Sequence, residues 1–132
     1  MKRLLIAFVA AWACLMDGQV SAHHSFDATY VENEAVTIEG DLVQVLYRNP
    51  HSFMHVTVME PNGSMARYAI EWSGVEQLGA DGVTRETLKL GDHLIINGNP
   101  GGNPSDRRVR LISLRRPSDG FGWETRRGDW MN

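Results

Sequence analysis

Residues 36–47 read VTIEGDLVQVLY, and this stretch decides the fold that the sequence predicts. Apolar residues alternate with polar ones along it, which is typical of a half-buried β-strand. The positions that alternate with polar neighbours are first Val36, Ile38 and Gly40, and then, in the shifted phase, Val43, Val45 and Tyr47. The phase of the alternation changes beside Gly40 and Asp41. This change predicts a β-bulge that bends one long strand around a corner.

Four more strands are predicted after this bend, because the same alternation returns. They cover residues 54–58, 67–72, 93–97 and 109–114. Pro61-Asn62-Gly63 separates the first two of them and is typical of a hairpin turn. Residues 99–105 (NPGGNPS) are rich in Gly, Pro and Asn, so we expect a mobile loop there.

One helix is expected between the third and fourth of the five strands. Ser73-Gly74-Val75-Glu76 matches a capping box, with Ser73 as the N-cap and Glu76 bonding back to its amide. Gly79 or Gly82 is expected to end the helix within two turns. This order of elements, with a bent first strand, predicts an all-β domain with one short helix, a small five-stranded OB-like barrel. An open β-sandwich is the alternative architecture.

The first 22 residues have the layout of a cleavable signal peptide. Lys2 and Arg3 give a positive start, residues 4–16 are uncharged and apolar, and Val20-Ser21-Ala22 supplies the small residues of a cleavage site. The apolar run is shorter than the roughly 20 residues that a membrane span needs. We therefore predict a periplasmic or secreted protein, with no stable membrane span after processing.

The chain thus divides into four segments. They are the signal peptide (1–22), an N-terminal extended segment (23–34), the OB-like barrel domain (35–116) and a C-terminal tail (117–132). Phe26 and Tyr30 are the candidate anchors of the extended segment. The tail is polar but carries aromatic residues, and we expect it to be only partly ordered.

Composition limits the function classes. Removal of the signal peptide lowers Lys+Arg from 13 to 11 and Asp+Glu from 16 to 15, so the mature net charge is −4 with neutral histidines. Binding of nucleic acid needs a basic face and is not expected. The single cysteine, Cys14, leaves with the signal peptide. Any metal would therefore be held by imidazole, carboxylate or the terminal amine.

The pair His23-His24 directly follows the predicted cleavage site. A cut after Ala22 makes His23 the first residue, so its amine and its ring Nδ1 can chelate one ion. A second imidazole completes the three-nitrogen arrangement called a histidine brace, and this nitrogen-only set favours Cu(II). The candidates for that imidazole are His51, His55 and His24, of which His51 is preferred because a turn can aim it at a nearby terminus.

Two further observations bear on this copper hypothesis. Glu71 or Asp27 could supply a carboxylate to the metal or to a ligating histidine. A cut after Ser21 would instead leave Ala22-His23-His24, whose third-position histidine makes a different amino-terminal copper site. The alternative to any metal is that the histidines are ordinary solvated polar residues, and His93 is interpreted as a surface residue of that kind.

The chain resembles the family of small exported bacterial proteins known as domain of unknown function 6152. The matching stretches are Ala22-His23-His24-Ser25-Phe26, Asn49-Pro50-His51, Trp72, Gly82-Val83-Thr84-Arg85, Leu88-Lys89-Leu90-Gly91-Asp92 and Pro117-Ser118-Asp119-Gly120. The chain departs from the family pattern at Val75-Glu76-Gln77-Leu78, where an Asn-containing run is expected, and at Leu90, where the family often has Pro. The resemblance implies export and a small β-barrel, but no activity.

Two functions remain as hypotheses. The first is a periplasmic copper-binding protein for storage, delivery or tolerance; the second is a metal-free module that binds an envelope protein or a small ligand. Motifs of nucleophilic, phosphate-binding, zinc-protease or redox enzymes do not occur in the sequence, so it favours a non-catalytic protein. An oxidase built on the brace is the third option. The basic cluster Arg107, Arg108, Arg110, Arg115 and Arg116 is interpreted as a charged edge strand rather than an anion site.

Overall fold

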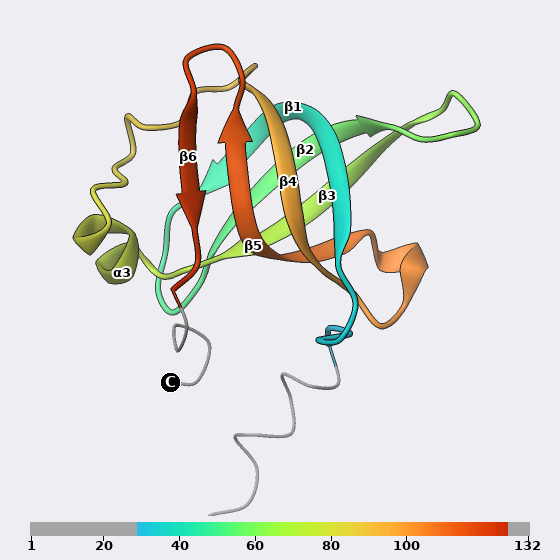
Figure 1. Ribbon diagram of the computed structural model, residues 1–132, viewed down its shortest axis with the longest axis horizontal. Helices are drawn as coiled ribbons and strands as arrows, with labels where there is room; N and C mark the ends of the chain where they lie inside the picture. Colours follow the sequence, from blue (N-terminus) through green and yellow to red (C-terminus); the bar gives the residue numbers. More distant parts are fainter. Residues whose placement is uncertain (1–28, 127–132) are drawn as a thin grey trace, which may run out of the picture.

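The computed structural model describes residues 29–126 as one β-barrel with a short helix (Figure 1). The elements are β1 (Val36–Leu46), β2 (Ser52–Met59), β3 (Met65–Trp72), α3 (Val75–Ala80), β4 (His93–Pro100), the 3₁₀ turn η1 (Pro104–Asp106), β5 (Arg108–Arg116) and β6 (Phe121–Glu124). The predicted signal peptide and the candidate residues His23, His24 and Asp27 lie outside the described residues. Within residues 29–126 no helix is long and apolar enough to cross a membrane.

The sheet closes on itself because β3, at one end of the strand order, also pairs with β5. The strand order is β3-β2-β1-β4-β5-β6, and β3 also pairs with β5. This closing pair is parallel, from Ala69 opposite Arg108 to Glu71 opposite Arg110, whereas the other pairs are antiparallel. The predicted five-stranded OB-like barrel is therefore confirmed, and the open sandwich is not formed.

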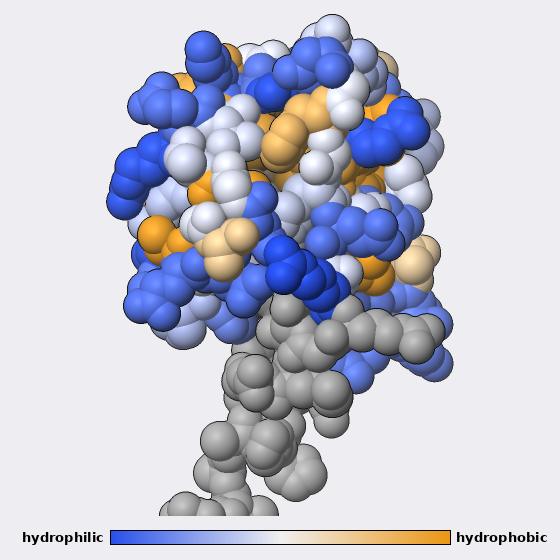
Figure 2. All heavy atoms as spheres, turned by 60° about the vertical axis from the view of Figure 1, so that its left-hand side comes forward, coloured by the Kyte–Doolittle hydropathy of each residue, from blue (hydrophilic) through white to orange (hydrophobic). Residues whose placement is uncertain are grey.

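The barrel interior is filled by the apolar residues that the alternation assigns to it. The fully buried side chains include Met54, Val56, Ile70, Leu94, Ile96, Val109, Leu111 and Leu114. Burial of one such side chain stabilises the fold by roughly 1.5–3 kcal/mol. The outside of the barrel is mixed: on the side shown in Figure 2, hydrophobic residues reach the surface in small patches between hydrophilic ones.

The bulge in β1 lies further along the strand than the sequence predicts. The register with β2 shifts between Leu42 and Gln44, so Leu42 is buried and Val43 is 41% exposed. The predicted position of the bulge, beside Gly40 and Asp41, is therefore wrong. Gly40 has another function: a Cβ there would lie 2.4 Å from the carbonyl oxygen of Thr57, so the glycine permits close approach of β1 and β2.

The predicted capping box is also wrong. The N-cap residue of α3 is Gly74, which has no side chain that could cap the helix. The carbonyl of Ser73 accepts a hydrogen bond from Ser52 N at 3.1 Å, so its backbone continues the strand pairing and cannot turn into a cap. Instead Oδ1 of Asn49 accepts from Val75 N at 2.9 Å. The helix ends at Ala80, before Gly82 at φ +78°, as predicted.

Two segments that looked irregular are structured. β4 extends to Pro100, so the expected mobile loop 99–105 begins as strand, and Asn99 is buried with its amide donating to Glu32 O and Glu34 O. The tail contributes β6, which pairs with β5. The Trp123 ring of β6 packs edge-on against Trp72, with ring centroids 5.4 Å apart.

Candidate functional site

Glu71 is the centre of a polar cluster on the outside of the barrel. It lies near the end of β3, and only 7% of the residue is exposed. One carboxylate oxygen, Oε1, bonds to Nδ1 of His51, and the other, Oε2, accepts from the hydroxyl of Tyr30. Nη2 of Arg108 lies 3.4 Å from Oε2 and supplies the opposite charge. A single buried carboxylate thus joins three segments that are distant in sequence.

His51 is positioned by the short connection between β1 and β2. Arg48 Nε donates to the carbonyl of His51 at 3.3 Å, and the hydroxyl of Ser52 donates to the carbonyl of Arg48 at 3.2 Å. The amide of Arg48 in turn donates to Ser52 Oγ at 3.2 Å. These bonds fix the turn backbone, and the side chain of His51 remains 21% exposed. The turn therefore presents an imidazole that Glu71 orients and that is partly exposed.

Tyr30 is attached to the same cluster from the N-terminal side. Tyr30 forms a β-bridge with Gly101, Val31 N donates to Pro100 O at 2.9 Å, and Gly102 N donates to Thr29 O at 2.9 Å. The residue is 2% exposed, which confirms it as an anchor of the extended segment. Burial and the neighbouring Glu71 raise the pKa of the Tyr30 phenol well above its usual range, so it stays a neutral donor.

Guanidinium groups and aromatic rings alternate around this carboxylate. Arg48 lies over Phe53 at 4.9 Å, Arg108 contacts both Phe53 at 5.8 Å and Tyr30 at 5.7 Å, and Arg110 lies 5.7 Å from Tyr30. Each such contact contributes roughly 0.5–1 kcal/mol at exposed sites. Of these groups, Arg108 also forms an ion pair with Glu71, at a place where water is largely excluded.

The other histidines of the described chain have separate partners. His55 Nδ1 accepts from Arg67 Nε at 2.9 Å, and burial together with Arg67 lowers the pKa of His55. His93 lies between two carboxylates, with Nδ1 2.7 Å from Asp41 Oδ1 and Nε2 2.7 Å from Glu39 Oε1. The structure therefore brings His51, but not His55, to Glu71 and to the N-terminal anchor.

The described residues alone do not form a complete metal site. Between residues 29 and 126 no three side chains of His, Cys, Asp or Glu gather closely enough to hold an ion. His51 and Glu71 form a pair. Because Glu71 bonds to Nδ1 of His51, it has the position of a carboxylate that orients a metal-binding histidine, and not the position of a metal ligand. A metal at His51 would need a further donor from outside this range, which is where His23 and His24 fall.

The interpretation of the arginines as a charged edge strand is wrong. β5 pairs with β3, β4 and β6, so it is not an edge. Arg110 is buried and contacts Glu32 Oε1 at 3.0 Å and Asn99 Oδ1 at 3.1 Å. The partnership of Arg108 with Glu71 was missed from sequence. No local sequence pattern signals it, because it depends on the parallel pairing of β3 with β5.

Together, these features define a small closed five-stranded β-barrel that carries a carboxylate–imidazole pair beside its N-terminal anchor. The chain belongs to the family of unknown function DUF6152, whose family model matches residues 11–109. The matched range includes the anchor Tyr30, the turn at His51 and Glu71. No curated protein matches the chain.

Proposed function

We propose that the processed protein binds one Cu(II) ion in the periplasm through its first residue, His23, with His51 as the second imidazole. The amine and ring Nδ1 of His23 would supply two nitrogens and Nε2 of His51 the third. Nitrogen donors and the absence of thiolate favour Cu(II) among divalent ions. The role that follows is storage, delivery or tolerance of copper rather than catalysis.

One observation carries the proposal: Tyr30 and His51 bond to the two oxygens of the same carboxylate, Glu71. The N-terminal segment is therefore attached beside the preferred imidazole. Six residue steps separate His23 from Thr29, and such a segment reaches at most about 20 Å. That length is sufficient for His23 to return to His51 from the anchor.

The Glu71 contact also supports His51 as a ligand. A metal-binding histidine usually bonds through its second ring nitrogen to a carboxylate or a carbonyl, which sets its tautomer and orientation. Here Nδ1 faces Glu71, so Nε2 is the ring nitrogen that would coordinate the ion. His55 has its Nδ1 on Arg67, a cationic donor that offers no such support.

The first experiment is the intact mass of the exported protein, which fixes its terminus. The mature protein starting at His23 is then titrated with Cu(II), and the complex is examined by electron paramagnetic resonance for three coordinated nitrogens. Three alanines added before His23 are expected to weaken binding by about 100-fold, because the two-nitrogen chelate is lost and no histidine then lies among the first three residues. His51→Gln is expected to cost at least about tenfold.

Matched variants separate this site from incidental copper binding. His93→Gln removes another exposed imidazole and is expected to leave the affinity unchanged, whereas Glu71→Gln should weaken binding about tenfold through the orientation of His51. Equal affinity of the native and the extended protein would contradict the proposal. A mature terminus at Ala22 would also contradict it, since the third-residue site at His24 does not use His51. The metal-free interaction module would then be the remaining hypothesis.

A further inference from the structure

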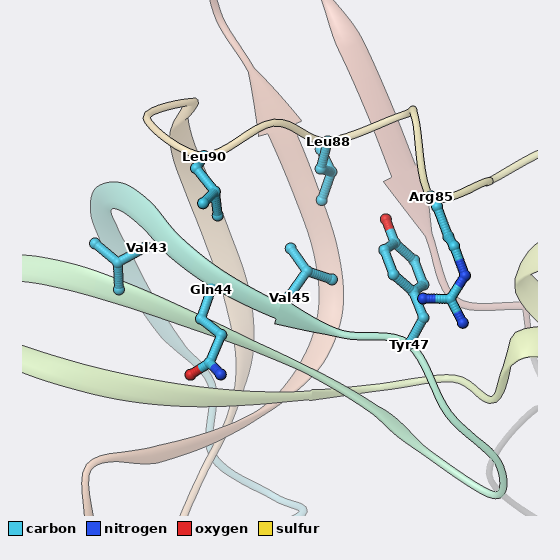
Figure 3. A pocket seen from close by; sticks show the side chains of 7 residues that line it. All are labelled: Val43, Gln44, Val45, Tyr47, Arg85, Leu88 and Leu90. Carbon is cyan, nitrogen blue, oxygen red and sulfur yellow. The ribbon is translucent and has the colours of Figure 1, made fainter.

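An open groove runs between the second half of β1 and the segment that connects α3 to β4. Its volume is about 350 Å³, and it is lined by Val43, Gln44, Val45, Tyr47, Arg85, Leu88 and Leu90. Figure 3 shows Val45 pointing from the strand toward the segment, and Leu88 and Leu90 pointing back toward the strand. The groove is separate from the cluster around Glu71, because the two sets share no residue.

The floor of the groove is an unpaired strand edge. β1 pairs with β4 only from Val36 to Asp41, and the last bonds on that side join Leu42 to Gly91 and Asp92. Residues 44–46 pair with β2 on their other side. In the described part of the chain no strand covers the remaining edge over residues 43–46, and such an edge is a template for an additional strand.

The side chains around this edge are apolar and exposed. Leu90 is 70% exposed and Val43 is 41% exposed, whereas Leu88 is buried. Proteins rarely leave apolar side chains beside an open strand edge without a partner, because the combination favours association. The apolar lining would receive the alternate side chains of an added strand.

One end of the groove offers polar contacts. The Arg85 guanidinium lies 5.4 Å from the centre of the Tyr47 ring, and no charged residue other than Arg85 lines the groove. The hydroxyl of Tyr47 is buried and has no hydrogen-bond partner among residues 29–126. Burial raises the pKa of the Tyr47 phenol, so it remains a proton donor. A carboxylate placed at this end of the groove would face the positive charge of Arg85.

We propose that this groove binds one extended peptide segment of a partner protein, which pairs with the free edge of β1 and carries apolar and acidic side chains. The mode is β-strand addition, in which backbone bonds give affinity and side-chain pockets give specificity. A second copy of the barrel fits poorly, because the segment that carries Leu88 and Leu90 stands opposite the edge across the groove (Figure 3). A single strand can enter where a folded domain cannot.

The probe is a fluorescent eight-residue peptide of alternating valine and glutamate, blocked at both ends, titrated against the mature protein by anisotropy. A peptide with lysine in place of glutamate should bind at least about tenfold more weakly to the native protein. Arg85→Glu should reverse this preference. A valine–glutamate peptide with N-methylated alternate amides should not bind, because it cannot pair with the strand.

Leu90→Glu and Met59→Glu provide a matched pair, because these side chains are 70% and 69% exposed and neither supports the core. The first should weaken binding about tenfold and the second should leave it unchanged. Amide chemical-shift changes are expected over residues 43–47 and 84–91. Equal binding of the N-methylated peptide, binding that Leu90→Glu does not affect, or no binding at millimolar concentration would overturn the proposal. Dimerisation through β1, or shifts in the groove on removal of residues 127–132, would also overturn it.

Discussion

Glu71 shows how one residue can join the fold to a candidate site. Its carboxylate is buried on the outside of the barrel, where an unpaired charge would be costly, and it is stabilised by Tyr30, His51 and Arg108 together. Removal of any one donor leaves the charge with fewer partners. The contacts that hold the N-terminal segment and the contacts that orient His51 are therefore energetically coupled through the same group.

His93 allows a test of electrostatics at the level of a single residue. The hydrogen bonds that the His93 ring donates to Asp41 and Glu39 raise the pKa of His93 above its usual value. The stability that this pairing contributes is fully present below the unfolded pKa of about 6.5, and it is lost as the pH rises through the higher folded value. We expect the melting temperature of the native protein to exceed that of His93→Gln, and we expect this difference to be larger at pH 6 than at pH 8.

The measurement is the melting temperature of both proteins by circular dichroism at half-unit steps between pH 5.5 and 8.5. The difference between the two curves isolates His93, because the other titrating groups are shared. A difference that is constant with pH, or one that grows toward pH 8, would show that the two carboxylates do not stabilise the protonated ring.

At the level of elements, the start of α3 depends on a residue outside its own sequence neighbourhood. Asn49, in the connection before β2, accepts from the first helical amide at Val75, and Gly74 approaches Pro50 O so closely that a Cβ would lie 2.4 Å away. The turn that carries His51 and the helix are therefore fixed against each other. A local motif search assigns the cap to Ser73, because it cannot detect a partner that is 26 residues away.

Asn49→Ala is expected to lower the free energy of unfolding by about 1 kcal/mol, the usual cost of losing an N-terminal cap. Ser73→Ala and Glu76→Ala, which remove the two residues of the capping box, should each change it by less than about 0.5 kcal/mol. The unfolding free energies of all three variants are measured by urea unfolding. They are comparable when the dependence of this free energy on urea concentration has the same slope in each variant. A larger loss of unfolding free energy for the Ser73 and Glu76 variants than for Asn49→Ala would show that the capping box, and not Asn49, stabilises the start of the helix.

At the level of the whole molecule, the barrel follows from the sequence better than the site does. The inward residues Met54, Val56, Leu94 and Leu111 are all buried, because alternation records which face of a strand is apolar. The position of the bulge at Val43 was missed, since Gly40 serves close strand approach instead. Alternation along single strands also does not report which polar residues of different strands meet.

The candidate site illustrates that second limit. His51 was the preferred imidazole and Glu71 was one of its two expected carboxylates, and the contact between them is present. The roles of Arg108 and of the hydroxyl of Tyr30 depend on the parallel pairing of β3 with β5 and on the bridge to Gly101. These pairings join residues up to about 70 positions apart, and no local pattern encodes them.

Closure of the barrel depends on β4, which joins β1 on one side and β5 on the other. Its register with β5 shifts between Asn97 and Gly98, where the two backbones come close together. A Cβ at Gly98 would lie 2.1 Å from the carbonyl oxygen of Arg110 and 2.6 Å from Cγ1 of Val109. Since one of these contacts is with backbone, a rotamer change alone cannot relieve it.

Gly98→Ala is therefore expected to separate β4 from β5 and to lower the free energy of unfolding by about 3 kcal/mol. Gly79→Ala is the matched control: it adds the same methyl group inside α3, where nothing lies within 4 Å, and should stabilise by about 0.5–1 kcal/mol. Urea unfolding measures both, and amide exchange of β4 and β5 reports where the first variant loosens. A Gly98→Ala protein within about 1 kcal/mol of the native one would show that β4 and β5 can move apart without opening the barrel.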